Sequence, residues 1–297
     1  MNQLVDISSE VLPKLPPRAA DSHKGDYGRA LLVGGSRGMS GAIALAGLAA
    51  LRSGAGLVTL AVPRTIQDVV ASFDPSYMTH GLADDGQRFV ANASNEVLAM
   101  AADADVVALG PGLGRAAEVT HFVERLYRET PLPMIVDADA LFALAERPQA
   151  LTAPGGPRIL TPHPGEFARL TGCATDNDDR ARSLAAGELA SASGGSAEII
   201  VVLKGHHTIV TDGARFSTNQ TGNPGLATGG TGDVLTGILT ALVGQGLAPF
   251  DAARLGVHLH GLAGDLAAKE LGQVSLIASD VVDHLPAAFL SFDGRAS

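Results

Sequence analysis

Short apolar runs alternate with longer amphipathic or Ala/Leu-rich segments along most of the chain. The runs that we predict to be buried strands are Arg29–Val33, Leu57–Val62, Asp105–Leu109, Pro133–Val136, Arg158–Leu160 and Ile199–Leu203, with Thr208–Thr211 as hairpin partner of the last. The segments that we predict to be helices are Ala42–Arg52, Ala116–Arg128, Ala181–Ser191, Thr231–Val243, Ala252–Glu270 and a last one starting with Asp280–Leu285. This alternation predicts βαβ units, and so an α/β fold in which helices flank a mostly parallel central sheet.

Glycine and polar residues follow the predicted strands directly. They are Gly34, Gly110, Asp137, Thr161 and Lys204. Ligands of open α/β sheets bind outside the carboxyl ends of the strands. We therefore expect the catalytic and ligand-binding residues of the chain to lie at that edge.

Composition narrows the possible partners. Hydrophobic residues make up 46% of the 297 residues, enough for a sizeable core, and we expect one domain over residues 1–297 with a polar, Pro-rich lead-in over 1–25. The net charge of −10 gives no electrostatic attraction to nucleic acid or to an anionic membrane. No signal peptide or apolar span is evident, and the single Cys173 cannot form an intramolecular disulfide, so we expect a cytoplasmic protein.

The strongest motif is the segment Asn223–Asp233 (NPGLATGGTGD), which precedes an apolar helix. Gly230 and Gly232 let the backbone curl tightly and approach a ligand, and the helix start offers free N–H groups to an anion. An Asp inside an anion site makes sense as a general base for the group that attacks a phosphate. We therefore predict that Asp233 is the base and that the Gly230, Thr231 and Gly232 amides hold the phosphoryl group; the alternative is a helix cap.

Six further segments, together with this motif, carry a resemblance that covers nearly the whole chain. They are KGDYGRALLVGGS (Lys24–Ser36), Ser40–Pro63, GPGLG (Gly110–Gly114), VDADAL (Val136–Leu141), LTPHPGEFARL (Leu160–Leu170) and VLKGHHTIV (Val202–Val210). In that order they resemble the ADP- or ATP-dependent NAD(P)H-hydrate dehydratases, a family with the three-layer ribokinase-like fold.

The resemblance implies a metabolite-repair lyase that uses Mg²⁺. Such an enzyme converts the S epimer of hydrated NADH or NADPH (NADHX, NADPHX) to the intact cofactor by phosphorylating the hydrate hydroxyl and eliminating phosphate. The resemblance leaves the donor open between ADP and ATP. The Ala- and Arg-rich composition is typical of bacterial chains, and stand-alone bacterial members of the family resemble ADP users, so we expect ADP. It also implies a homo-oligomer, either dimer or tetramer. Because the match begins almost at the N-terminus, we expect a separate NAD(P)H-hydrate epimerase as functional partner.

The resemblance also assigns substrate-binding residues: Ala42, Gly112, His163 and Asp233. Ala42 would let the substrate lie on its helix, although a small residue there could simply serve helix packing. Gly112 could equally belong to a turn. His163 lies between two prolines at a strand end, which stiffens its backbone and directs its ring.

Nucleotide and metal sites follow in the same way. The implied nucleotide-binding residues are Lys204, Gly205, His206, His207, Thr208 and Gly232. Glu166 could help to hold Mg²⁺, or could only favour a helix start. We expect no two-histidine metal site at His206 and His207, because neighbouring strand residues point to opposite faces.

His258 and His260 lie two apart in a predicted helix and cannot share a face, so we interpret them as core or surface residues.

Three alternatives to the dehydratase activity remain at this point. A ribokinase-like kinase of a thiazole or pyrimidine alcohol would use the same anion site and base. A non-catalytic nucleotide-binding regulator would need neither Asp233 nor an intact glycine run. A dinucleotide-binding dehydrogenase is disfavoured because GGSRGMSG does not give the GxGxxG pattern.

Overall fold

The computed structural model describes residues 4–175, 178–193 and 197–294. Its centre is a ten-stranded sheet with the strand order β1-β10-β9-β8-β7-β6-β5-β2-β3-β4. The run from β8 to β4 is parallel throughout, while β9 is antiparallel to both of its neighbours. The strands are β1 (Val5–Asp6), β2 (Arg29–Val33), β3 (Leu57–Pro63), β4 (Met78–Leu82), β5 (Val106–Leu109), β6 (Met134–Val136), β7 (Arg158–Leu160), β8 (Ile199–Leu203), β9 (Ile209–Thr211) and β10 (Arg215–Thr218).

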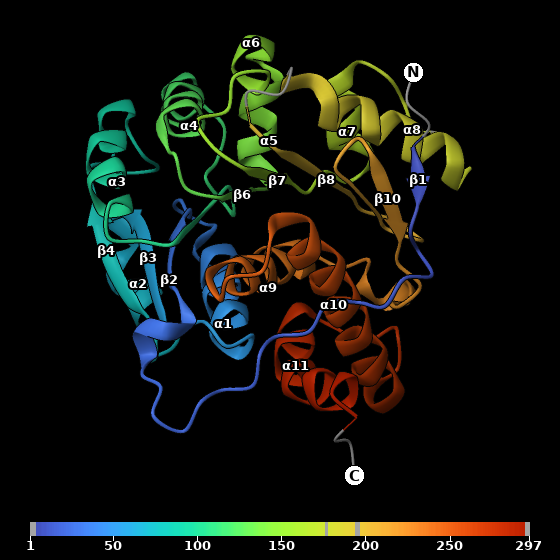
Figure 1. Ribbon diagram of the computed structural model, residues 1–297. Coiled ribbons are helices and arrows are strands. Elements are labelled where there is room, and N and C mark those ends of the chain that lie inside the picture. Colours follow the sequence, from blue (N-terminus) through green and yellow to red (C-terminus); the bar gives the residue numbers. More distant parts are fainter. Residues whose placement is uncertain (1–3, 176–177, 194–196, 295–297) are drawn as a thin grey trace.

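Helices cover both faces of this sheet (Figure 1). The helices are α1 (Ser40–Arg52), α2 (Gln67–Ala71), α3 (Ser94–Ala101), α4 (Ala117–Glu129), α5 (Ala138–Ala145), α6 (Pro148–Leu151), α7 (Pro164–Thr171), α8 (Asp179–Ala190), α9 (Thr231–Gly244), α10 (Pro249–Leu271) and α11 (Ala278–Phe292). Short 3-10 turns occupy Lys24–Tyr27, Arg64–Ile66, Ala91–Ala93, Ser191–Ser193 and Pro224–Leu226.

Two hydrophobic cores result, one on each face. Successive strand residues point to opposite sides, so Leu32 and Ala108 pack into the core under α1, α9, α10 and α11, whereas Leu31 and Val107 pack under α3, α4, α5 and α8. Because both faces are covered, the central strands are apolar at nearly every position, which is why they were visible as continuous runs in the sequence. The predicted three-layer α/β architecture is confirmed.

Several elements were not predicted from the sequence. β4 has the sequence MTHGL, which is not a continuous apolar run. It lies at the edge of the sheet, where its residues other than Leu82 are exposed or only partly buried. Within the segment expected as a lead-in, Val5 and Asp6 form β1, which pairs with Arg215 and Phe216 of β10. The predicted hairpin is confirmed, since β9 pairs antiparallel with β8.

Among the described residues, no helix combines the length and apolarity that a membrane crossing requires.

Candidate active site

The carboxyl ends of five neighbouring strands form the edge at which we expected the functional residues to lie. Gly34 follows β2, Gly110 follows β5, Asp137 follows β6, Thr161 follows β7 and Lys204 follows β8, and these strands are adjacent in the sheet. The backbone fits tightly here, because a Cβ on Gly110 would lie 1.9 Å from the Asp137 carbonyl oxygen. Parallel strands thus bring residues as far as 170 positions apart to one edge.

An ion pair between Asp137 and Lys204 forms the centre of the site. The Lys204 Nζ lies 2.8 Å from Asp137 Oδ1 and 3.8 Å from Glu166 Oε2. The other Asp137 oxygen accepts a hydrogen bond of 2.9 Å from the Thr236 hydroxyl of α9, and the carboxylate is almost fully buried. Burial alone would lower the pKa of Lys204, but Asp137 and Glu166 outweigh it, so the pKa lies above its ordinary value and Lys204 stays charged.

The backbone at Asp137 is strained. Asp137 caps the start of α5, and the next residue, Ala138, has a φ of 50°. Non-glycine residues rarely adopt this left-handed conformation, and where they do, the surrounding structure holds them in it. Here the buried contacts of Asp137 with Lys204 and Thr236 supply that constraint.

The glycine loop (Asn223–Asp233) positions the start of α9 beside this ion pair. Gly230 has a φ of 92° and precedes the helix, and a Cβ there would lie 2.8 Å from Leu45 Cδ1, so only glycine fits. The first bond of α9 is donated by the Val234 N–H to the Gly230 carbonyl at 3.1 Å. The N–H groups of Thr231, Gly232 and Asp233 therefore point out of the helix start, as an anion site requires.

Gly232 connects the glycine loop to the ion pair. A Cβ added to Gly232 would lie 3.3 Å from Lys204 Nζ and 3.6 Å from Asp137 Oδ2. The absence of a side chain thus leaves Lys204 facing the start of α9. A positive side chain and the positive end of a helix dipole converge at this point, which suits a negatively charged ligand.

Asp233 is the most perturbed carboxylate of the site. Burial, followed by the nearby negative charge of Asp137, raises its pKa to about 7, although Lys204 opposes the change. Asp139 and Glu166 add to the increase. A carboxylate whose pKa lies near 7 can accept and return a proton at neutral pH, which is what general acid–base chemistry requires.

The residues expected at the substrate lie on the neighbouring strand ends. Gly112, with a φ of 65°, packs against α1: a Cβ on it would lie 3.1 Å from the Ala42 Cβ. The Gly112 carbonyl accepts a hydrogen bond of 2.8 Å from the Ser36 hydroxyl. The two residues named for substrate contact are therefore neighbours in space, 70 positions apart in sequence.

His163 caps α7 and points toward the same edge. Its Nδ1 accepts from the N–H groups of Gly165 (3.0 Å) and Glu166 (3.3 Å), while the Glu166 carboxylate accepts from the His163 N–H at 2.9 Å. Burial and the charge of Lys204 lower the pKa of His163. Because Nδ1 accepts hydrogen bonds, the proton of the neutral ring belongs on Nε2, which lies 3.4 Å from Glu166 Oε1. Burial also raises the pKa of Glu166.

The β8–β9 turn (Lys204–Thr208) is the stretch expected to bind a nucleotide. Buried Arg182 of α8 lies behind it and donates to the carbonyls of His206 (2.8 Å) and His207 (3.1 Å). The His207 ring contacts Asp179 at 2.8 Å, and the Thr208 hydroxyl bonds to Gly205. Sequence reasoning missed Arg182 because nothing in a helical arginine shows which loop it will support.

The two histidines of this turn lie closer together than we expected. Their ring centroids are 3.9 Å apart, because His206 and His207 lie in a turn, where His207 has a φ of 55°, and not on a strand. The argument from opposite strand faces was therefore wrong. Even so, no group of three metal-binding side chains is found among the described residues.

His260 was interpreted as an ordinary core or surface residue, but it reaches the glycine loop. Its Nε2 lies 2.9 Å from the Thr231 carbonyl oxygen, and burial lowers its pKa to about 4, so it is neutral and donates this bond. His258, by contrast, packs its ring near Phe292. The two histidines do point in different directions, as their spacing predicted.

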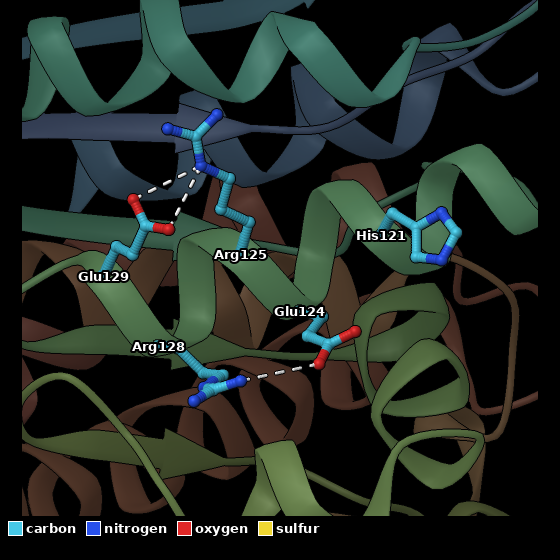
Figure 2. Close-up of a pocket in the computed structure, with 5 residues that line it drawn as sticks. All are labelled: His121, Glu124, Arg125, Arg128 and Glu129. Carbon is cyan, nitrogen blue, oxygen red and sulfur yellow. Dashed lines mark hydrogen bonds and ion pairs between the residues drawn. The ribbon is translucent and has the colours of Figure 1, made fainter.

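One hollow on the surface does not belong to this site. It has a volume of about 390 Å³ and is lined by residues of α4 only: His121, Glu124, Arg125, Arg128 and Glu129. Figure 2 shows that its charges pair with one another, Arg125 with Glu129 and Arg128 with Glu124. With its charges already neutralised, this exposed helix face offers nothing comparable to the strand-end edge.

The fold and the glycine loop define the class of the chain. Ribokinase from Arabidopsis thaliana, solved with ribose and ATP, superposes with a TM-score of 0.55 at 15% identity over 87% of this chain and 98% of that one, which shows a common fold. The chain is thus an α/β protein with the ribokinase-like fold.

Closer relatives identify the family. The family model for NAD(P)H-hydrate dehydratase matches residues 30–287, so the chain belongs to the NAD(P)H-hydrate dehydratase family, as its motifs predicted. The ADP/ATP-dependent NAD(P)H-hydrate dehydratase of Bacillus subtilis, co-crystallised with ATP and Mg²⁺, is 35% identical with a TM-score of 0.78 over 94% of each chain.

A longer relative matches as well. The bifunctional NAD(P)H-hydrate repair enzyme Nnr of Moorella thermoacetica is 46% identical over 92% of this chain but 51% of its own length. The chain therefore spans about half the length of the curated relatives that it matches.

Proposed function

We propose that this chain dehydrates the S epimer of NADHX and NADPHX to the intact cofactors at the expense of ADP or ATP. The observation that carries the proposal is Asp233: a carboxylate with a pKa of about 7 in the first turn of a helix whose free N–H groups face a charged lysine. The family membership and the dehydratase from Bacillus subtilis support the substrate class.

The chain's own residues account for a phosphoryl transfer. Asp233 takes the proton from the hydrate hydroxyl, whose oxygen then attacks the terminal phosphorus of the nucleotide. The bond from that phosphorus to the bridging oxygen breaks, and AMP leaves from ADP, or ADP from ATP. The N–H groups at the start of α9 and the Lys204 ammonium stabilise the charge that develops on the transferred group. The C–O bond to the phosphate then breaks and the neighbouring ring carbon loses a proton, so that inorganic phosphate leaves and the C=C bond is restored.

We assign the substrate and the nucleotide to different strand ends along this edge. We assign the hydrated ring to the space between His163, Asp233 and the paired Ala42 and Gly112, because these residues surround the ends of β2, β5 and β7. The nucleotide belongs to the β8–β9 turn and to Gly232, from where its terminal phosphate would reach Lys204.

The residues present fit Mg²⁺ as a co-substrate ion carried mainly by the nucleotide. Both oxygens of Asp137 are already engaged, by Lys204 and Thr236, and both of Asp139 are engaged by Gly114 and Arg115. Asp233 is assigned as the base, and Glu166 Oε2 accepts from the His163 N–H, but Glu166 Oε1 has only a 3.4 Å contact with His163 Nε2 and is the least engaged oxygen of the other three acids. Mg²⁺ commonly keeps several waters and takes one or two carboxylates with substrate phosphates, so Glu166 would hold it, directly or through water. When bound, the ion would neutralise phosphate charge.

We also propose a cytoplasmic homo-oligomer that works beside an NAD(P)H-hydrate epimerase. The support for the epimerase is that the Moorella relative is described as bifunctional and is about twice the matched length. The oligomer and the location rest on the family resemblance alone.

The alternative activity is phosphorylation of a thiazole or pyrimidine alcohol. The ribokinase structure, a small-molecule kinase, is similar in fold only, whereas the dehydratase match extends to sequence.

Absorbance at 340 nm distinguishes the two. The purified protein is incubated with Mg²⁺ and hydrated NADH or NADPH, with ADP, ATP or no nucleotide. A nucleotide-dependent increase is expected, and it identifies the donor. A flat trace with nucleotide consumed would mean phosphorylation without elimination. A flat trace with no nucleotide consumed would contradict the dehydratase and favour the alcohol kinase.

A further inference from the structure

A small pocket beside the site is lined in part by Arg115, Phe142 and Arg169, side chains to which the proposed reaction gives no role. It lies between α5 and α7 and has a volume of about 150 Å³. We call it the arginine pocket, and its lining is Arg115, Leu141, Phe142, His163, Gly165, Glu166 and Arg169. Whole-ligand pockets usually hold 300–1,000 Å³, so this one suits a single group of a larger ligand.

Two guanidinium groups share one aromatic ring in this pocket. The Arg115 guanidinium lies 4.3 Å from the centroid of the Phe142 ring, and that of Arg169 lies 4.6 Å from the same centroid. Both distances are within the range of a cation–π contact. The ring thus holds two like charges close together, an arrangement that an anion would stabilise.

The charge of the two arginines is not equally compensated. Arg115 Nε bonds to Asp139 at 3.0 Å, and the same carboxylate accepts from the Gly114 N–H. The Arg169 guanidinium contacts the Phe142 ring but has no hydrogen bond or ion pair with any of the side chains or carbonyl groups that the structure describes. Glu166, the other acid of the lining, is turned toward the His163 N–H and Lys204. One oriented cation is therefore left available at the pocket.

The pocket lies on the substrate side of the edge. Arg115 follows the GPGLG segment, whose Gly112 packs against Ala42, and His163 lines both the pocket and the substrate space. The β8–β9 turn, where the nucleotide is assigned, follows β8, while the pocket is built on the helices after β6 and β7. An anion in the pocket is thus more easily part of the hydrated cofactor than part of the nucleotide donor.

We propose that the arginine pocket binds a phosphate group of the dinucleotide substrate, with Arg169 as its main charged contact. The inference rests on the proposed function and extends it to the part of the substrate remote from the reacting ring. Guanidinium groups match phosphate oxygens in geometry and charge. The group is either the pyrophosphate, which both cofactors carry, or the additional phosphate of NADPH.

The test replaces Arg169 by Met, which keeps a long apolar stem against Phe142, and by Lys, which keeps the charge. Arg128→Met is the matched control, because Arg128 is an exposed arginine of α4 that pairs with Glu124 and lines neither the arginine pocket nor the proposed substrate space (Figure 2). Equilibrium binding of NADH and NADPH is measured from the fluorescence of the reduced nicotinamide, and KM is measured for each hydrate and for the nucleotide. Thermal unfolding confirms that each variant is folded.

We expect Arg169→Met to weaken dinucleotide binding roughly ten- to a hundredfold, the range for a charged hydrogen bond, with an equal increase in KM for the hydrate. The nucleotide KM and kcat should change less than twofold, and Arg169→Lys should recover part of the affinity. Losses for both cofactors identify the pyrophosphate, and a loss for NADPH alone identifies its additional phosphate.

Unchanged binding of both cofactors by Arg169→Met would overturn the proposal, as would a loss of the same size in Arg128→Met. The outcome is separable from that of the proposed function. A wild-type protein that binds NADPH through Arg169 without dehydrating the hydrate would contradict only the activity. A protein that dehydrates it with an unaltered KM in Arg169→Met would contradict only the pocket.

Discussion

Two loops meet at the active edge of the sheet, and they are held in place in different ways. The glycine loop before α9 owes its shape largely to its own residues: Gly230 adopts a φ of 92°, and the helix behind it starts at the next residue. The β8–β9 turn owes its shape to Arg182, which lies on another element and donates to its carbonyl oxygens. A loop shaped by its own glycines can be recognised in a sequence. A loop shaped by a distant side chain cannot.

The comparison also separates chemistry from binding. The glycine loop carries Asp233, whose pKa is shifted by burial and by the neighbouring acids. In the β8–β9 turn, carbonyl groups and the His207 ring are already engaged by α8. We therefore expect substitutions in the glycine loop to affect kcat. Substitutions of the α8 residues that hold the β8–β9 turn should affect the affinity for the nucleotide.

The largest effect is expected from Asp233→Asn. Losing the base should lower kcat by roughly a hundredfold to ten-thousandfold, the range for removal of a general base, while the Kd for nucleotide stays within about threefold. Single-turnover kinetics and calorimetric titration with nucleotide measure the two. Near-normal turnover in this variant would show that another group takes the proton.

The next largest effect should come from Arg182→Met. Because several carbonyl groups lose their buried donor, we expect a loss of roughly 2–4 kcal/mol in the free energy of unfolding and a tenfold or greater increase in KM for the nucleotide. Arg180→Met is the matched control on the same helix, since Arg180 bonds to Leu4 and not to the turn. Equal nucleotide defects in both variants would mean that α8 acts only through general stability.

A third prediction concerns the pH dependence of stability. The pKa of Asp233 is about 7 in the fold and near 3.8 in the unfolded chain, so the folded state holds a proton that the unfolded state has already released between those values. The free energy of unfolding should therefore decrease as the pH increases from 4 to 7.

Asp233→Asn removes this penalty, so it should be more stable than the wild type by roughly 1–3 kcal/mol at pH 8 and equally stable near pH 4. Urea unfolding at the two pH values measures the difference. A constant difference between the two proteins across the pH range would show that the pKa of Asp233 is not raised.

The smallest effect is expected from Gly232→Ala. The new Cβ would lie 3.3 Å from Lys204 Nζ, so the ammonium must move slightly, and we expect kcat/KM to decrease a fewfold to tenfold without unfolding. Gly229→Ala is the control, since a Cβ there meets nothing within 4 Å. If both variants were equally active, the spacing between Gly232 and Lys204 would be unimportant.

Much of the site was predictable because its signals are local. The strand ends with Gly110, Asp137 and Lys204 follow from continuous apolar runs, which two-sided burial produces. The glycine run before α9 predicts an anion site by the same kind of local reasoning. The strands β4 and β10 were missed because neither is a continuous apolar run: β4 (MTHGL) is an edge strand, and β10 (RFST), next to the two-residue edge strand β1, has a single large apolar residue, Phe216.

The sequence by itself determined the fold class, the family and the residues that face the edge of the sheet, because backbone conformation and burial leave marks on neighbouring residues. Only the tertiary structure decided which of these residues touch. It paired Lys204 with Asp137, set His260 behind Thr231 and brought Arg115 and Arg169 to one ring. Charges and hydrogen bonds act over a few ångströms in space, and the chain order of two residues does not record that distance.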